Sequence, residues 1–324
     1  MRIALLLIAY LFLLSFSIGK VVNDRKEQGV KGNVKFFSEK YYSIGKSGGQ
    51  VLYNTKFFRF DSAGHLLEKA EYEGVGQTVS VTYASSDSAE IKHSSYITNG
   101  GLNNKTVYTY DKRGNKTEVR EYKSDTTKYE RTGYYYNSKH QLIEVMTFDI
   151  YGHWTWLYDY KYDSKGVRIG EQQRDQHNVL REDTKLTYDE KGKLIVSDTK
   201  GNSAIESGKL VWKYDDKNNQ IEEDLYNANG STYYIKTFKY DERNNQLEEQ
   251  VIEGDGSFSY KIAYKYDENN NKIWSNRYKT KDSIGSFTYT YTYENIDKAG
   301  NWLKKTTYEN GMPDIMEERT IEYY

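Results

Sequence analysis

A short phrase that recurs at a constant spacing constrains the fold of this 324-residue chain more than any other feature. One copy is Tyr240-Asp241-Glu242-Arg243-Asn244, a tyrosine followed by four polar residues. A fixed spacing of this kind indicates a repeat architecture, in which adjacent copies form the same small unit and stack side by side. The tyrosines that mark the copies lie 26 residues apart, at Tyr110, Tyr136, Tyr162, Tyr188, Tyr214, Tyr240 and Tyr266.

The polar stretch has the chemistry of a hairpin turn. An aspartate at its first position can accept hydrogen bonds from backbone N–H groups further along the turn. Its fourth position is usually Gly or Asn, the residue types that most readily adopt positive φ. We therefore predict a type I turn that closes through a left-handed residue. The predicted turn-forming positions are Asp111, Gly114, Asp163, Gly166, Asp189, Gly192, Asp215, Asn218, Asp241, Asn244, Asp267 and Asn270.

A second row of turns lies between the copies of the first. Its members are Gly152, Asn178, Gly230 and Gly256, spaced by 26, 52 and 26 residues. Between the two rows, apolar and polar residues alternate, as they do in the stretch from Phe258 to Tyr266. This period of two is typical of a β-strand. Each repeat is therefore predicted to be a β-hairpin that continues into the next one.

The turn also predicts a register. If the four polar residues form the loop, Tyr240 faces Asn245 and Phe238 faces Leu247. Leu247 belongs to a column of aliphatic residues at the 26-residue spacing, so this register places the column opposite the aromatic side chains, a favoured cross-strand pairing. The column consists of Ile143, Ile169, Ile195, Ile221, Leu247 and Ile273.

These patterns predict an all-β fold, an antiparallel β-hairpin repeat meander. A sheet this long tends to curl, so we expect a curled or spiral sheet with its tyrosine-rich face inward. Composition agrees, because the chain holds 34 tyrosines and one proline. Tyrosine favours strands, and so many aromatic residues are unusual in a disordered chain.

The N-terminus reads as a secretory leader. Arg2 precedes an apolar run from Ile3 to Leu14, and small residues at Ser17 and Gly19 suit a cleavage near Gly19. We therefore predict a signal peptide over 1–19 and a secreted, periplasmic or cell-surface protein with no transmembrane span after the leader is removed. A less regular segment over 20–54 is expected to cap the first strand, and 55–324 to form the repeat domain.

Composition excludes several classes of function. The chain has no cysteine, so it has neither disulfides nor thiolate chemistry. Its formal net charge of −1 offers no overall field for nucleic acid. The five histidines show no metal-site spacing, and no nucleotide-binding motif is present. We therefore expect no cofactor, no metal and no nucleic-acid partner.

A resemblance to a known family follows from the repeated phrase. Tyr110-Asp111-Lys112-Arg113-Gly114-Asn115 and its copies resemble the YD-repeat (Rhs-type) family over about residues 55 to 310. The resemblance implies a β-spiral, which in some members forms shells around toxin polypeptides and in others serves cell-surface contact or carbohydrate recognition. This chain differs in its longer repeat. We expect it to be too short to enclose a cargo domain, with no toxin domain after the last repeat.

The clearest interruption of the repeat inside the array is Asp149, His153, Trp154 and Trp156, which we take as the candidate binding residues. Aromatic rings can stack on sugars, although packing in a core explains the same tryptophans. The repeated aspartates are more readily explained as turn formers than as catalytic groups.

The sequence thus favours a binding protein that is not an enzyme, with a polysaccharide or a cell-surface protein as partner. Three alternatives stay open: a glycan hydrolase with paired carboxylates, a structural spacer, and a toxin-associated or immunity repeat protein.

Overall fold

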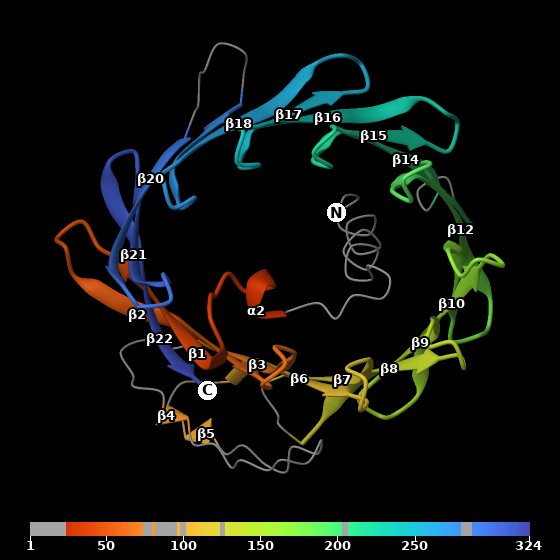
Figure 1. Cartoon of the computed structure of the whole chain (residues 1–324), viewed down its shortest axis with the longest axis horizontal. Coiled ribbons are helices and arrows are strands. Elements are labelled where there is room, and N and C mark those ends of the chain that lie inside the picture. The colour runs from red at the N-terminus through yellow and green to blue at the C-terminus, as the bar shows by residue number, and fades with distance from the viewer. Residues whose placement is uncertain are drawn as a thin grey trace. The chain divides into compact units, whose positions relative to one another are not determined.

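The computed structural model describes residues 24–73, 80–81, 96–97, 102–123, 127–202, 207–279 and 287–324. Over these residues the chain is almost entirely antiparallel β-structure, with one short helix, α2 (Asp24–Glu27) (Figure 1). The predicted all-β hairpin meander is confirmed. The predicted leader over 1–19 lies outside the described residues.

Twenty strands form one antiparallel sheet, and β4 (Ser80–Val81) and β5 (Tyr96–Ile97) form a second. The strands of the large sheet in the first half of the chain are β1 (Val34–Ile44), β2 (Gln50–Phe60), β3 (Leu66–Glu73), β6 (Leu102–Tyr110), β7 (Lys116–Lys123), β8 (Tyr129–Tyr136), β9 (Leu142–Phe148) and β10 (Trp154–Tyr162). Those in the second half are β11 (Arg168–Asp175), β12 (Leu180–Tyr188), β13 (Leu194–Gly201), β14 (Gly208–Tyr214), β15 (Gln220–Asn227), β16 (Thr232–Tyr240), β17 (Gln246–Glu253), β18 (Phe258–Tyr266), β19 (Lys272–Tyr278), β20 (Phe287–Ile296), β21 (Trp302–Glu309) and β22 (Met312–Tyr323).

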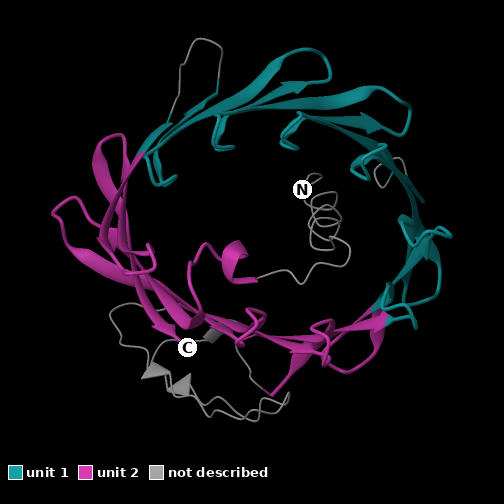
Figure 2. Ribbon diagram, in the orientation of Figure 1, with its two compact units in different colours: residues 1–20, 136–145, 156–289 teal, residues 21–135, 146–155, 290–324 magenta. Residues whose placement is uncertain are grey.

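The chain divides into two compact units (Figure 2). Unit 1 comprises residues 1–20, 136–145 and 156–289, and unit 2 comprises residues 21–135, 146–155 and 290–324. Within each unit the sheet follows a curved path. In unit 2 the first strand, β1, pairs with both β2 and the last strand, β22.

The first row of turns has a constant geometry, which the turn before β17 illustrates. The Asn244 N–H donates to the Asp241 carbonyl (3.1 Å), and the Asp241 N–H donates to the Asn245 carbonyl (2.9 Å). The Asp241 carboxylate accepts from the Arg243 and Asn245 N–H groups (2.9 and 2.8 Å). The fourth residue of each predicted turn has φ between 63° and 85°, and these residues are Gly114, Gly166, Gly192, Asn218, Asn244 and Asn270. Asn and Gly tolerate this left-handed conformation at low cost.

The predicted register is wrong by two residues. Phe238 pairs with Glu249, where we expected Leu247, and Tyr240 pairs with Gln246. One residue of the difference comes from the turn, which closes between Asp241 and Asn245, and the other from a β-bulge at Leu247. A shift of two keeps every side chain on its predicted face, whereas a shift of one would reverse the faces.

The bulge recurs in each hairpin of unit 1 and falls on the aliphatic column. Ile169, Ile195, Ile221 and Ile273 are each skipped in the pairing of their strand, as Leu247 is. These side chains therefore do not pair with the aromatic residues as predicted. Most members of the column are also substantially exposed: Ile143 38%, Ile169 43%, Ile221 36%, Leu247 37% and Ile273 38%.

The aromatic positions pair instead with a column of small or acidic residues. Trp212 pairs with Glu223, and its indole N–H donates to that carboxylate (3.1 Å). The Tyr234 hydroxyl also donates to Glu223 (2.7 Å), and Lys236 lies 3.5 Å away. Glu223 is therefore buried with its charge compensated, as a buried carboxylate requires. The corresponding pairs are Tyr160–Glu171, Leu186–Ser197, Phe238–Glu249 and Tyr264–Ser275.

The tyrosine of the repeated phrase connects neighbouring hairpins. The Tyr240 hydroxyl donates to the Gln220 carbonyl (2.8 Å), and the Tyr266 hydroxyl donates to the Gln246 carbonyl (3.0 Å). The turns themselves are linked by the Asn245 side-chain amide, which donates to the Asn270 side chain (2.9 Å). These bonds recur with the repeat, so they explain why tyrosine and asparagine recur with it.

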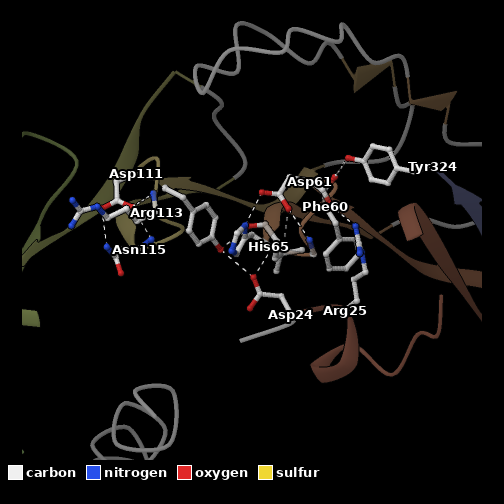
Figure 3. Close-up of polar contacts among 12 residues, drawn as sticks. Asp24, Arg25, Phe60, Asp61, His65, Asp111, Arg113, Asn115 and Tyr324 are labelled. Atoms are coloured by element: carbon white, nitrogen blue, oxygen red, sulfur yellow. Dashed lines mark hydrogen bonds and ion pairs between the residues drawn. The ribbon is translucent and has the colours of Figure 1, made fainter. Parts of the chain in front are cut away.

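In unit 2, the residues before β1 pack onto the sheet through a polar cluster (Figure 3). The Asp24 carboxylate accepts from the Leu66 N–H (2.5 Å), and Arg25 donates to the Val34 carbonyl (2.7 Å) and to the Asp61 carbonyl. Asp61 in turn holds the buried His65 ring through Nδ1 (2.7 Å). An apolar cluster lies beside these groups, formed by Val30, Val34, Phe37, Phe58, Phe60 and Leu66.

Candidate functional site

The turn between β9 and β10 carries two of the four predicted binding residues, Asp149 and His153, and the other two, Trp154 and Trp156, lie on β10. The Asp149 carboxylate accepts from the Tyr151 and His153 N–H groups (both 2.9 Å), and His153 Nδ1 lies 3.2 Å from its second oxygen. Desolvation opposes ionisation of Asp149, but these hydrogen bonds outweigh it and hold the pKa of its carboxyl below the ordinary value. Asp149 therefore performs the same turn-forming task as Asp241.

The two tryptophans of this segment lie two residues apart on β10, so they are on the same face of the strand. Trp154 is half-buried, and Trp156 pairs with Asp175 and is 37% exposed. The most exposed ring of the turn is Tyr151, at 73%, which lies 6.3 Å from the His153 ring. Tyr151 was not among the predicted binding residues.

A groove in unit 1 lies where the sequence spacing of the second row is interrupted. The 52-residue gap between Asn178 and Gly230 leaves Ala204 at the position that elsewhere carries Gly or Asn. Strand β13 ends at Gly201 and β14 begins at Gly208, with the Ser207 hydroxyl accepting from the Gly201 N–H (2.9 Å). A groove of about 720 Å³ opens here. The 52-residue gap in the sequence therefore marks the position of the groove. The predicted binding residues did not include any residue at this gap.

Side chains from three strands line the groove. Asp198 of β13 pairs with Lys209 of β14, which pairs with Tyr226 of β15. Because directly paired residues share a sheet face, these side chains form one row across the strands. Lys200 and Asn227 complete the polar lining. The groove thus combines one aromatic ring with cationic lysine donors, an anionic aspartate acceptor and a neutral amide.

A buried carboxylate lies two residues from the groove on β15. Asp224 is 6% exposed, and one of its oxygens has no hydrogen-bond partner within the described residues. Burial raises the pKa of Asp224, and the neighbouring Glu222 raises it further. The Tyr226 hydroxyl donates to Asp224 (3.4 Å), and burial together with this carboxylate raises the pKa of Tyr226.

Two sets of acidic groups have clear structural roles. The repeated aspartates close the first-row turns, and Glu223 accepts from Trp212 and Tyr234. Among the described residues no cluster of His, Asp or Glu could hold a metal ion. Within the same residues, no helix has the length and hydropathy of a membrane span.

Comparison with known proteins gives distant structural similarity only. No family model matches the chain, and no curated protein is similar to it. A chain of the TcdB2–TccC3–Cdc42 complex has a TM-score of 0.41 at 12% identity, and a chain of the Photorhabdus luminescens Tc holotoxin pore has 0.41 at 13%. Each alignment covers 85% of this chain but 15% of the other. A porin-like protein from Bacteroides uniformis has a TM-score of 0.37 at 10% identity, covering 90% of this chain and 99% of that one.

Proposed function

We propose that this chain is a secreted or cell-envelope protein that binds a polysaccharide in the unit 1 groove and does not cleave it. The groove is the observation that carries the proposal. Tyr226 offers a ring for stacking on a sugar, and Asp198 and Asn227 offer acceptors for its hydroxyl groups. Pockets that combine an aromatic surface with a few polar groups are typical of small-ligand and sugar sites. The location outside the cytoplasm rests on the predicted leader.

The proposal that the chain is not an enzyme rests on how its carboxylates are used. Hydrolysis of a glycan normally requires two carboxyl groups placed on either side of the scissile bond. Among the described residues, Asp198 and Asp224 are the acidic residues nearest the groove, and they lie on β13 and β15, with β14 between them. Strands two apart in a sheet are separated by about 10 Å, and the two residues are also offset along the strands, so their backbones are farther apart than the carboxyl groups of a retaining pair, at about 5 Å, or of an inverting pair, at up to about 9.5 Å.

Affinity electrophoresis of the mature protein through gels that contain different polysaccharides tests the binding. We expect retardation by at least one polymer, and its loss in Tyr226→Ala. Tyr278→Ala is the matched control, because Tyr278 pairs with Lys261 as Tyr226 pairs with Lys209, two repeats away from the groove. Retardation that survives in Tyr226→Ala and disappears in Tyr151→Ala would place the site on the β9–β10 turn instead.

The same polymers test for hydrolysis. After prolonged incubation we expect no increase in reducing ends. An increase that Asp224→Asn or Asp198→Asn abolishes, in a variant with unchanged thermal unfolding, would establish a glycan hydrolase and refute this part of the proposal.

A further inference from the structure

The cations around the groove differ from the other lysines of the same sheet face. Lys209 and Lys200 line the groove, and Lys185 pairs with Asp198 at its edge. All three are exposed, and within the described residues none of them has a carboxylate within ion-pair distance. Unpaired, exposed ammonium groups remain available to an anionic ligand.

The remaining lysines of this face in unit 1 are engaged. Lys261 occupies the same repeat position as Lys209, two repeats later, and its ammonium lies 2.6 Å from Glu248. Lys239 also contacts Glu248 (2.8 Å), Lys213 contacts Glu222, Lys161 contacts Asp183 (3.4 Å), and Lys265 lies over the Trp274 ring (4.9 Å). Four of these five lysines thus have a carboxylate partner and the fifth has an aromatic ring, whereas the three lysines at the groove have no carboxylate partner within the described residues.

The arrangement gives the groove a local positive charge. Lys185, Asp198 and Lys209 form one row on consecutive strands, so the two ammonium groups flank a single carboxylate. Their Cα atoms lie about 10 Å apart, twice the spacing between strands. Lys200 adds a third cation, whereas the whole chain has a formal net charge of −1. Among the described residues, the three ammonium groups at the groove thus outnumber the carboxylates of Asp198 and Asp224.

From these observations we propose that the groove selects an acidic polysaccharide, one whose sugars carry carboxylate or sulfate groups. This inference rests on the proposed function. The lysines pair with the anionic groups of the polymer, while Tyr226 packs against a sugar ring and Asn227 contacts its hydroxyls. A neutral polymer would leave the three ammonium groups without partners and would gain only the stacking contact.

Isothermal titration of the mature protein with polygalacturonate, with its carboxyl-reduced neutral counterpart and with a sulfated glycan tests the inference. We expect binding to one or both acidic polymers, and at least about tenfold weaker binding to the neutral one. Raising the salt concentration from 50 to 500 mM should weaken binding to the acidic polymers, since exposed charge pairs are screened.

The double variant Lys200→Gln/Lys209→Gln should weaken binding about tenfold and flatten the salt dependence. Lys261→Gln is the matched control and should leave both unchanged. Equal affinity for acidic and neutral polymers, or a double variant that binds like the native protein, would overturn the inference while leaving the proposed function intact. No binding to any polymer would overturn both. Equally tight binding of a single-stranded DNA oligonucleotide would show a general polyanion site and would also overturn the acidic-sugar assignment.

Discussion

The repeats of unit 1 and the first strands of unit 2 are stabilised in different ways. Around β1 to β3, unit 2 has a contiguous apolar cluster in which Val34, Phe37 and Phe60 are at most 1% exposed. On β12, β14 and β17 of unit 1 a single apolar side chain is buried, namely Leu186, Trp212 and Val251, and half-buried side chains surround it.

Unit 1 compensates for its sparse core with repeated polar bonds. The hydroxyls of Tyr162, Tyr214, Tyr240 and Tyr266 each donate to a carbonyl of the preceding hairpin, aspartates such as Asp241 close the turns, and carboxylates such as Glu223 join adjacent strands. Each such bond contributes a modest net free energy, but it recurs with every repeat. These bonds can therefore stabilise each added repeat in the same way. The strands near the chain termini in unit 2 are stabilised by an apolar cluster instead.

The largest expected effect comes from the unit 2 cluster. Phe60→Ala should destabilise the protein by about 3–5 kcal/mol, because a fully buried ring is removed and its cavity cannot collapse completely. The half-buried Phe238 of unit 1 is the comparison, and Phe238→Ala should cost roughly half as much. Urea unfolding measures both changes. Equal costs would show that the two regions do not differ in core packing.

A smaller effect is expected from the bond between hairpins. Tyr240→Phe removes the hydroxyl that donates to Gln220 and should cost about 1 kcal/mol. Tyr188→Phe is the control, because the Tyr188 hydroxyl has no hydrogen-bond partner within the described residues. Hydrogen exchange should show faster opening of β15 and β16 in Tyr240→Phe alone. If both variants behave alike, the hydroxyl bond is not what couples the hairpins.

The turn carboxylates should make stability depend on pH. Hydrogen bonds from the Asn245 side chain and backbone lower the pKa of Asp241 relative to its ordinary value of 3.8. The ionised form is thus favoured in the folded state, so its contribution is complete above the ordinary value of 3.8 and is lost as the pH falls below it, through the lower pKa of the folded state. Asp241→Asn should lower the Tm by roughly 2 °C at pH 7 and by less at pH 3. A difference that is larger at pH 3 would contradict this sign.

The smallest effect is expected at the bulge. Leu247 is 37% exposed and is skipped in the strand pairing, so Leu247→Thr should change stability by less than about 0.5 kcal/mol. Val251 of the same strand is 5% exposed, and Val251→Thr should cost more, because it buries a hydroxyl. Thermal unfolding compares the two. A large loss in Leu247→Thr would support the register first predicted from the sequence.

The candidate site shows the limit of sequence reasoning. Asp149, His153, Trp154 and Trp156 stood out because they interrupt the repeat, and in the structure Asp149 closes its turn as Asp241 does. The groove at Tyr226 lies where the second row has a 52-residue gap in its otherwise regular spacing. Such a gap marks an interruption of the repeat, but it does not show that residues of β13, β14 and β15 line a groove there.

The sequence by itself determined the hairpin repeat, its strands and the chemistry of its turns. These features depend on interactions within a few residues, such as an aspartate that binds N–H groups two and four positions along, and on an alternation that neighbouring residues carry. The tertiary structure alone decided the register, the exposure of the aliphatic column and the position of the groove. A bulge adds one residue to one of two paired strands, and the alternation of apolar and polar residues in the two strands does not reveal it. Its placement therefore depends on packing against strands from other repeats.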